Sequence, residues 1–380
     1  MRVSAITLVV LLTAGLAAAQ RHKLATADSG TPEGQLLLQI EGEPDEAKRT
    51  GLLGQFAAQY PKHEGVAWVY EMMVAAYGKA GQPDKVIETG EKLLAIDPAD
   101  LDTAHNCLKA AEAKKDPGLV RKWSAATSEL ARKVAQSPQP AAEDEVEGWK
   151  QRVDFAKQVD VYTEYALYAA ALQTANPKAR IELGEALEQR NPTSQYMSLM
   201  AQPLFAAYLQ TRENAKGLAF AGRAADRNQA SPEILLAVAS GYMEKKQPEK
   251  AIAVSQRAIE DSEAKQKPDG VANGDWQTWK AQIGGRARWI LGLSYAAQSK
   301  WSSADRALRA ALPAVKGDQN MYAQALFYLG LANYGMASAG QLDRARDALR
   351  FSQECANIPG PFQSPARANV RAISAEFRVR

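Results

Sequence analysis

The chain lacks most of the residues that catalytic and metal-binding motifs require. It has 380 residues but only two cysteines and three histidines, His22, His63 and His105. The histidines show neither HExxH nor zinc-finger spacing. There is no CxxC pair, no G-x-S-x-G, no Walker A loop and no G-x-G-x-x-G after a strand. We therefore expect no metal, no cofactor and no nucleophilic active site.

The two cysteines are too few and too far apart to suggest a disulfide framework. Cys107 and Cys355 are separated by 248 positions, and both lie in Ala-rich helical patterns. A bridge needs Cα atoms within about 7 Å. We expect two buried free thiols. His105 and Cys107 are two residues apart on one expected helix and do not share a face, which argues against a Cys–His nucleophile.

Long apolar runs are absent after the N-terminal segment, so no later membrane span is expected. Met1–Ala19 combines Arg2, an apolar stretch and three small residues, a pattern typical of a secretory signal. We place cleavage before Gln20, although retention of the segment as an anchor stays open. The expected location is the periplasm or the extracellular space.

A strong net charge is also missing, because the formal charge is only +3. This argues against nucleic acid as a partner. The charge is uneven, however. Residues 280–380 hold fourteen Lys/Arg against six Asp/Glu, whereas residues 20–279 hold 31 against 37. The C-terminal cations are interpreted either as solvated helix faces or as a surface for an acidic partner or polymer.

Alternating strand patterns are absent, and apolar residues recur at helical spacing. The segment 70–98 is one clear example, with large or aromatic residues first, Gly81 at a turn and Pro98 at the end. Its register recurs in later segments at Gly241-Tyr242 and at Leu291-Gly292 with Tyr295, each followed by two alanines at fixed spacings. It recurs again at Leu329-Gly330, which leads to Ala345 with roughly three extra residues in the turn. Weaker copies occupy residues 101–134, 164–192 and 198–231. Small residues opposite large ones allow two helices to pack closely.

This 34-residue register resembles the tetratricopeptide repeat (TPR) over roughly residues 67–359. The resemblance implies an all-α fold, an α-solenoid of antiparallel helix hairpins. The expected parts are a signal at 1–19, a flexible N-terminus at 20–32, repeats at 33–134, an insertion and linker helix at 135–160, repeats at 161–359 with an insertion at about 262–284, and a capping helix within 360–380.

The resemblance also implies a concave face, lined by the first helix of each hairpin, that binds an extended peptide. The expected groove positions are Trp68, Asn106, Lys109, Tyr162, Tyr165, Gln202, Trp289, Phe327 and Tyr328. Aromatic rings there either anchor a partner or are buried between repeats. The carboxylate clamp of some family members is not reproduced, since only Asn106 fits it. Trp276 and Trp279 form a candidate contact on the insertion, or else pack the insertion onto the repeats.

Three functions are compatible with this sequence. The first is an exported, non-enzymatic scaffold that binds a protein or peptide, possibly in cell-envelope assembly or secretion. The second is an enzyme or enzyme subunit that uses the groove for substrate, and the third is a binder of an acidic polymer through the Arg-rich C-terminal third. The scaffold is favoured because the search for catalytic motifs is empty.

Overall fold

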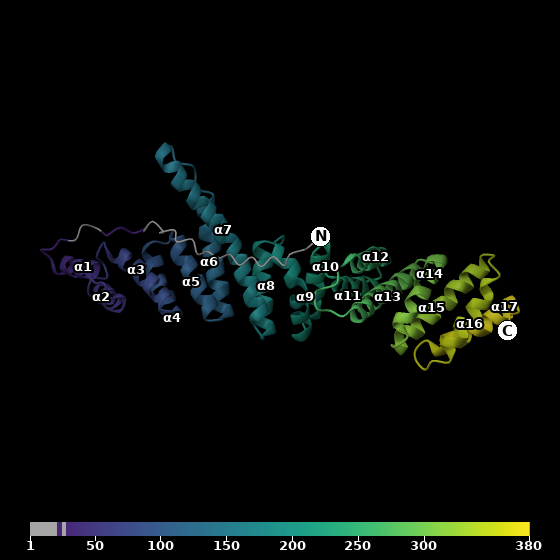
Figure 1. Cartoon of the computed structure of the whole chain (residues 1–380). Helices are drawn as coiled ribbons and strands as arrows, with labels where there is room; N and C mark the ends of the chain where they lie inside the picture. The colour runs from purple at the N-terminus through teal and green to yellow at the C-terminus, as the bar shows by residue number, and fades with distance from the viewer. Residues whose placement is uncertain (1–20, 25–27, 380) are drawn as a thin grey trace. The chain divides into compact units, whose positions relative to one another are not determined.

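The computed structural model describes residues 21–24 and 28–379, which form helices and no strands. They divide into two compact units, one ending at Arg190 and the other beginning at Asn191 (Figure 1). The predicted signal segment Met1–Ala19 lies outside the described residues. Among the described helices, none combines the length and the hydropathy of a membrane span.

Unit 1 consists of four helix hairpins. Its helices are α1 (Pro32–Gly42), α2 (Glu46–Gln59), α3 (Val66–Lys79), α4 (Pro83–Ile96), α5 (Leu101–Ala113), α6 (Pro117–Ala135), α7 (Glu143–Gln173) and α8 (Pro177–Arg190). Each helix packs on the next one in the chain, and α3, α5 and α7 also lie beside one another. Stacked helix hairpins are the arrangement of an α-solenoid.

Unit 2 has four hairpins and a final helix. Its helices are α9 (Gln195–Gln210), α10 (Asn214–Asp226), α11 (Pro232–Glu244), α12 (Pro248–Ala264), α13 (Asn273–Ala297), α14 (Trp301–Val315), α15 (Gln319–Ser338), α16 (Arg344–Ala356) and α17 (Gln363–Phe377). Here α11, α13 and α15 lie side by side, and α17 packs against α15 and α16. The expected all-α solenoid is therefore confirmed in each unit.

The same turn joins the two helices of six hairpins. In each, one residue adopts a left-handed backbone, and the next residue donates its N–H to the carbonyl five positions earlier. This bond closes the helix end in the manner of a Schellman motif. The left-handed residues are Gly81, Lys115, Arg212, Lys246, Ser299 and Gly340. The accepting carbonyl belongs to a tyrosine in four of the six hairpins, Tyr77, Tyr208, Tyr242 and Tyr295.

Glycines allow the helices of a hairpin to approach closely. A Cβ atom added to Gly292 on α13 would lie 2.5 Å from Leu308 Cγ on α14, and one on Gly330 would lie 2.5 Å from Ser352 Oγ on α16. Such distances are far inside van der Waals contact. The Leu-Gly pairs found in the sequence are thus the positions where the first helix of a hairpin touches the second.

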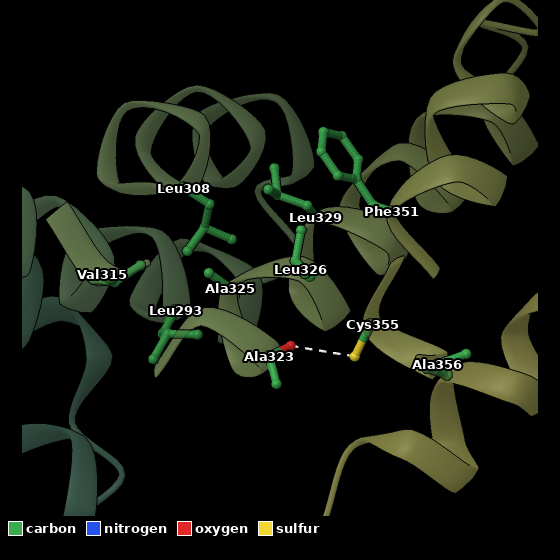
Figure 2. Close-up of a cluster of buried hydrophobic side chains, with 11 residues drawn as sticks. Leu293, Leu308, Val315, Ala323, Ala325, Leu326, Leu329, Phe351, Cys355 and Ala356 are labelled. Carbon is green, nitrogen blue, oxygen red and sulfur yellow. Dashed lines mark hydrogen bonds between the residues drawn. The ribbon is translucent and has the colours of Figure 1, made fainter. Parts of the chain in front are cut away.

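A cluster of buried side chains in unit 2 links α13, α14, α15 and α16 (Figure 2). Leu293, Leu308, Leu326 and Phe351 converge in it, and Cys355 donates its Sγ–H to the Ala323 carbonyl at 3.3 Å. Both cysteines are buried and free, as expected. Burial raises the pKa of Cys107 to about 12 and that of Cys355 to about 11, so both are unreactive thiols at neutral pH.

Three boundaries differ from those expected from the sequence. Helix α7 runs unbroken through residue 160, so the linker helix and the next repeat are one element. Helix α13 likewise begins inside the predicted insertion and continues into the repeat. The segment expected to be flexible holds fixed contacts at Arg21–Leu24, and α1 begins at Pro32.

Candidate partner-binding surfaces

Four of the predicted groove residues come together in unit 1, on neighbouring helices α5 and α7. Asn106 and Lys109 are exposed on α5, and Tyr165 is exposed on α7. The Tyr162 ring lies 5.1 Å from His105 in an edge-on arrangement and 6.0 Å from Tyr165. We call these five residues the tyrosine surface.

Tyr162 and His105 are uncharged at neutral pH. The Tyr162 hydroxyl donates to Glu112 Oε2 at 2.6 Å, and burial together with this bond raises the pKa of Tyr162. Burial lowers the pKa of His105 to about 4, an effect increased by Lys109. His105 is therefore a neutral, buried ring that packs against the ring of Tyr162. This arrangement presents aromatic area, not an acid–base pair.

Unit 2 contains a groove of about 430 Å³ between α11, α13 and α15. We call it the unit 2 groove. Apolar side chains make up most of its wall. Its lining residues are Glu233, Leu236, Ala237, Ser240, Ile283, Arg286, Trp289, Ile290 and Met321. The volume falls within the range of ligand-binding clefts, roughly 300–1,000 Å³.

Trp289 is the predicted residue that lines this groove. Its ring is half-buried, and its Nε1–H donates to the Met321 carbonyl at 3.2 Å. The bond joins α13 to α15 and fixes the ring against the groove wall. A rigid, partly exposed indole offers contact area with little loss of side-chain entropy on binding.

Glu233 places a carboxylate at one end of the groove. Its Oε1 accepts from Trp279 Nε1 at 2.8 Å. Burial opposes the charge, but hydrogen bonds from its own backbone, Ser231 and Trp279 outweigh it and lower the pKa of Glu233. The group is therefore an ionised carboxylate that these donors hold in place.

The insertion tryptophans pack onto unit 2. Trp276 and Trp279 stack with ring centroids 4.5 Å apart and planes at 8°. The Lys280 and Lys265 ammonium groups lie over Trp276 and Trp279, at 5.5 and 5.1 Å. Trp276 is buried, and Trp279 is tied to Glu233. The pair therefore holds the first turns of α13 in place and supports one end of the groove, and Trp276 offers no exposed contact.

The other predicted positions lie elsewhere. Trp68 is only 8% exposed, because the α1–α2 hairpin covers it with Leu36, Leu37 and Phe56, which corrects its assignment to an open groove. Gln202 is exposed on α9 but lines none of the grooves described above. Phe327 and Tyr328 are half-buried, with Phe327 5.3 Å from Phe362 of the capping region.

Sequence reasoning missed Glu233, Arg286 and Met321. The register that selects Trp289 on α13 also selects Glu233, Leu236 and Ser240 on α11, which are spaced at helical intervals. Met321 comes from a third helix, α15, and its place in the groove depends on how the three helices pack. No group of three or more potential metal ligands occurs among residues 21–24 and 28–379.

No model of a known protein family matches the chain, and no curated protein sequence matches it either. Solved structures do match it at low identity. Yeast Tom70 is 13% identical with a TM-score of 0.33, over 95% of this chain and 68% of that one. The APC/C hetero-tetramer Cut9-Hcn1 is 14% identical with a TM-score of 0.31, over 91% of this chain and 56% of that one. The TPR domain of P58(IPK) is 10% identical with a TM-score of 0.29, over 91% and 98%. The helices and turns of this chain itself therefore define its fold.

Proposed function

We propose that the protein is an exported scaffold that binds an extended segment of a partner protein in the unit 2 groove. The observation that carries this proposal is the half-buried Trp289 ring, held by the Met321 carbonyl, in a groove that is otherwise largely apolar. An indole ring that is already fixed can cover a partner's apolar side chain with little further loss of side-chain entropy.

An extended peptide supplies the chemistry that this groove lacks. Its apolar side chains fit against Leu236, Ile283 and Ile290. Burial of one such side chain contributes roughly 1.5–3 kcal/mol. Arg286, which is exposed at the same groove, can pair with a carbonyl or a carboxylate of the peptide. The groove therefore favours a partner with apolar side chains in an extended backbone.

The test starts from peptides selected by display on the mature chain, residues 20–380. Binding of a selected peptide is measured by fluorescence anisotropy to wild type, Trp289→Ala and Glu233→Gln. We expect a loss of at least about thirtyfold for Trp289→Ala, as for a binding hot spot. A smaller loss is expected for Glu233→Gln, which weakens the hydrogen bond that holds Trp279 at one end of the groove. Circular dichroism verifies that each variant is folded.

A matched pair of arginines serves as the control. Arg286 lines the groove, whereas Arg306 is exposed on α14 outside the set of lining residues. Arg286→Ala should weaken binding and Arg306→Ala should not. Peptides that bind all of the groove variants as tightly as wild type would refute the proposal.

The two other functions predicted from the sequence give different results in the same assays. Binding of an acidic polymer would fall steeply with salt and would depend on Arg306 as much as on Arg286. Several C-terminal arginines already pair with carboxylates, among them Arg288 with Glu263 and Arg309 with Asp305 and Asp347. Detectable substrate turnover by the purified protein would support an enzyme.

A further inference from the structure

The segment Arg21–Leu24, which we call the N-terminal strap, lies outside the helices and is hydrogen-bonded to unit 1. The backbone N–H groups of Arg21 and His22 both donate to the Glu71 carboxylate on α3, at 3.3 and 3.0 Å. The Arg21 guanidinium donates to both oxygens of Asp97, at 2.5 and 3.1 Å. One carboxylate thus holds the backbone and another holds the arginine side chain.

The next residues of the strap continue this pattern. The His22 ring is largely buried, with Nε2 3.7 Å from carboxylate oxygens of both Asp97 and Asp100. Lys23 is exposed, and Leu24 packs against the buried cluster of α1, α2 and α3. Proteins recognise extended peptides by combining two kinds of contact. Hydrogen bonds to the peptide backbone can form with any sequence, and separate contacts select individual side chains.

The receiving site, which we call the acidic notch, consists of Glu71, Asp97 and Asp100. Asp100 is buried and held by Thr103, whose backbone N–H and hydroxyl both donate to it. The notch therefore brings three carboxylates together around the Arg21 guanidinium and the His22 ring.

The contacts of the strap hold it on unit 1, but each contributes little enough free energy that another ligand can displace the strap. Arg21 is 42% exposed and its partner Asp97 is 22% exposed. Ion pairs with this much solvent contribute no more than about 1 kcal/mol each. The exposed face of α5 then leads from Asp102 to Asn106 and Lys109, at helical spacing, into the tyrosine surface. A longer ligand can contact all of these residues, whereas the strap contacts only the notch.

We propose that the acidic notch is a binding site for an extended, arginine-containing segment of a partner chain, and that the N-terminal strap occupies it as a competing ligand in the unbound protein. The partner's arginine replaces Arg21 on Asp97, and its backbone N–H groups replace those of the strap on Glu71. The rest of the partner segment lies along α5 toward Tyr162 and Tyr165. This site is separate from the unit 2 groove and does not depend on it.

The test uses a labelled peptide with the chain's own sequence at 20–27, Gln-Arg-His-Lys-Leu-Ala-Thr-Ala. Its binding is measured by fluorescence anisotropy to the mature wild-type chain and to the full mature chain carrying Arg21→Ala and His22→Ala. We expect the double variant to bind the peptide about tenfold more tightly, because a tethered strap competes at an effective concentration in the millimolar range. A peptide in which alanine replaces the arginine should bind the double variant at least tenfold more weakly.

Two further substitutions locate the peptide. Added to the double variant, Glu71→Gln should abolish binding, whereas Glu88→Gln, at an exposed carboxylate on α4 outside the notch, should leave it unchanged. Lys23→Ala in the wild-type chain should leave the strap bound and the peptide excluded. If circular dichroism shows the double variant to be unfolded, the single Arg21→Ala chain replaces it. Equal peptide binding by wild type and opened variant, or no binding by a folded opened variant, overturns the proposal.

Discussion

A close helix approach in a hairpin gives a sharp test of how the repeats are packed. Gly292 on α13 faces the fully buried Leu308 on α14. An added Cβ would lie 2.5 Å from its Cγ, 2.8 Å from its Cδ2 and 3.2 Å from its backbone N. Neither a branched carbon nor a helix backbone can move aside freely. Overpacking of this kind costs about 1–3 kcal/mol. We therefore expect Gly292→Ala to destabilise unit 2.

The control for this substitution is Gly222→Ala on α10, in the same unit. Gly222 also lies inside a helix, but nothing lies within 4 Å of an added Cβ there. Both variants gain the helix propensity of alanine, about 1 kcal/mol over glycine, so their difference isolates the packing penalty. That penalty of about 1–3 kcal/mol corresponds to roughly 2–12 °C in Tm for a unit of this size.

Thermal unfolding followed by circular dichroism at 222 nm, a standard wavelength for helix content, measures both variants. Gly222→Ala should unfold at or slightly above the wild-type temperature, and Gly292→Ala clearly below that of Gly222→Ala. Equal midpoints, or a higher one for Gly292→Ala, would show that α13 and α14 are not in close contact at this position. The hairpin geometry derived from the small residues would then be wrong.

Three other predictions follow from burial and from the N-terminal pattern. His105 has a pKa of about 4 in the folded chain against an ordinary 6.5, so the unfolded chain takes up a proton at His105 before the folded chain does as the pH falls. The free energy of unfolding should therefore fall by up to about 3 kcal/mol between pH 6.5 and pH 4. Urea unfolding measures this loss, which should be absent in His105→Phe. Cys107 and Cys355, with pKa values raised by burial to about 12 and about 11, should react with a disulfide reagent at pH 8 only after denaturation, and fast reaction of the native protein would contradict this. N-terminal sequencing of protein recovered from the cell envelope or medium should begin at Gln20, whereas a retained Met1 in the cytoplasm would refute export.

The repeats that were clearest in the sequence are those in which packing depends on residue size alone. Gly292 and Gly330 can be recognised because a glycine beside leucine, recurring at a fixed spacing inside a helix, indicates a close helix contact. The turn residues were harder to predict. Gly81 and Gly340 mark their turns, but Lys115 and Lys246 adopt the same left-handed conformation without any local signal. There the turn is imposed by the packing of the two helices, not by the residue in it.

The sequence predicted the candidate surfaces correctly where the packing of a single pair of helices determines which side chains are exposed. Asn106 and Tyr165 are exposed because their helix faces turn away from the partner helix. Trp68 was assigned to the same concave face, yet the irregular α1–α2 hairpin covers it, and the weak periodicity of residues 33–60 gave no indication of that cover. The unit 2 groove needs three helices in their final places before Glu233 and Met321 meet Trp289.

Four of the six recurring turns carry a side chain at the left-handed position, namely Lys115, Arg212, Lys246 and Ser299. Such a conformation costs a non-glycine residue about 1–2 kcal/mol. Glycine would relieve this strain, although it also raises the conformational entropy of the unfolded chain, which offsets part of the gain in stability. These turns lie outside the unit 2 groove, the tyrosine surface and the acidic notch. The protein therefore holds a reserve of stability that substitutions at the turns can release, which makes it a practical starting point for a thermostable binding module.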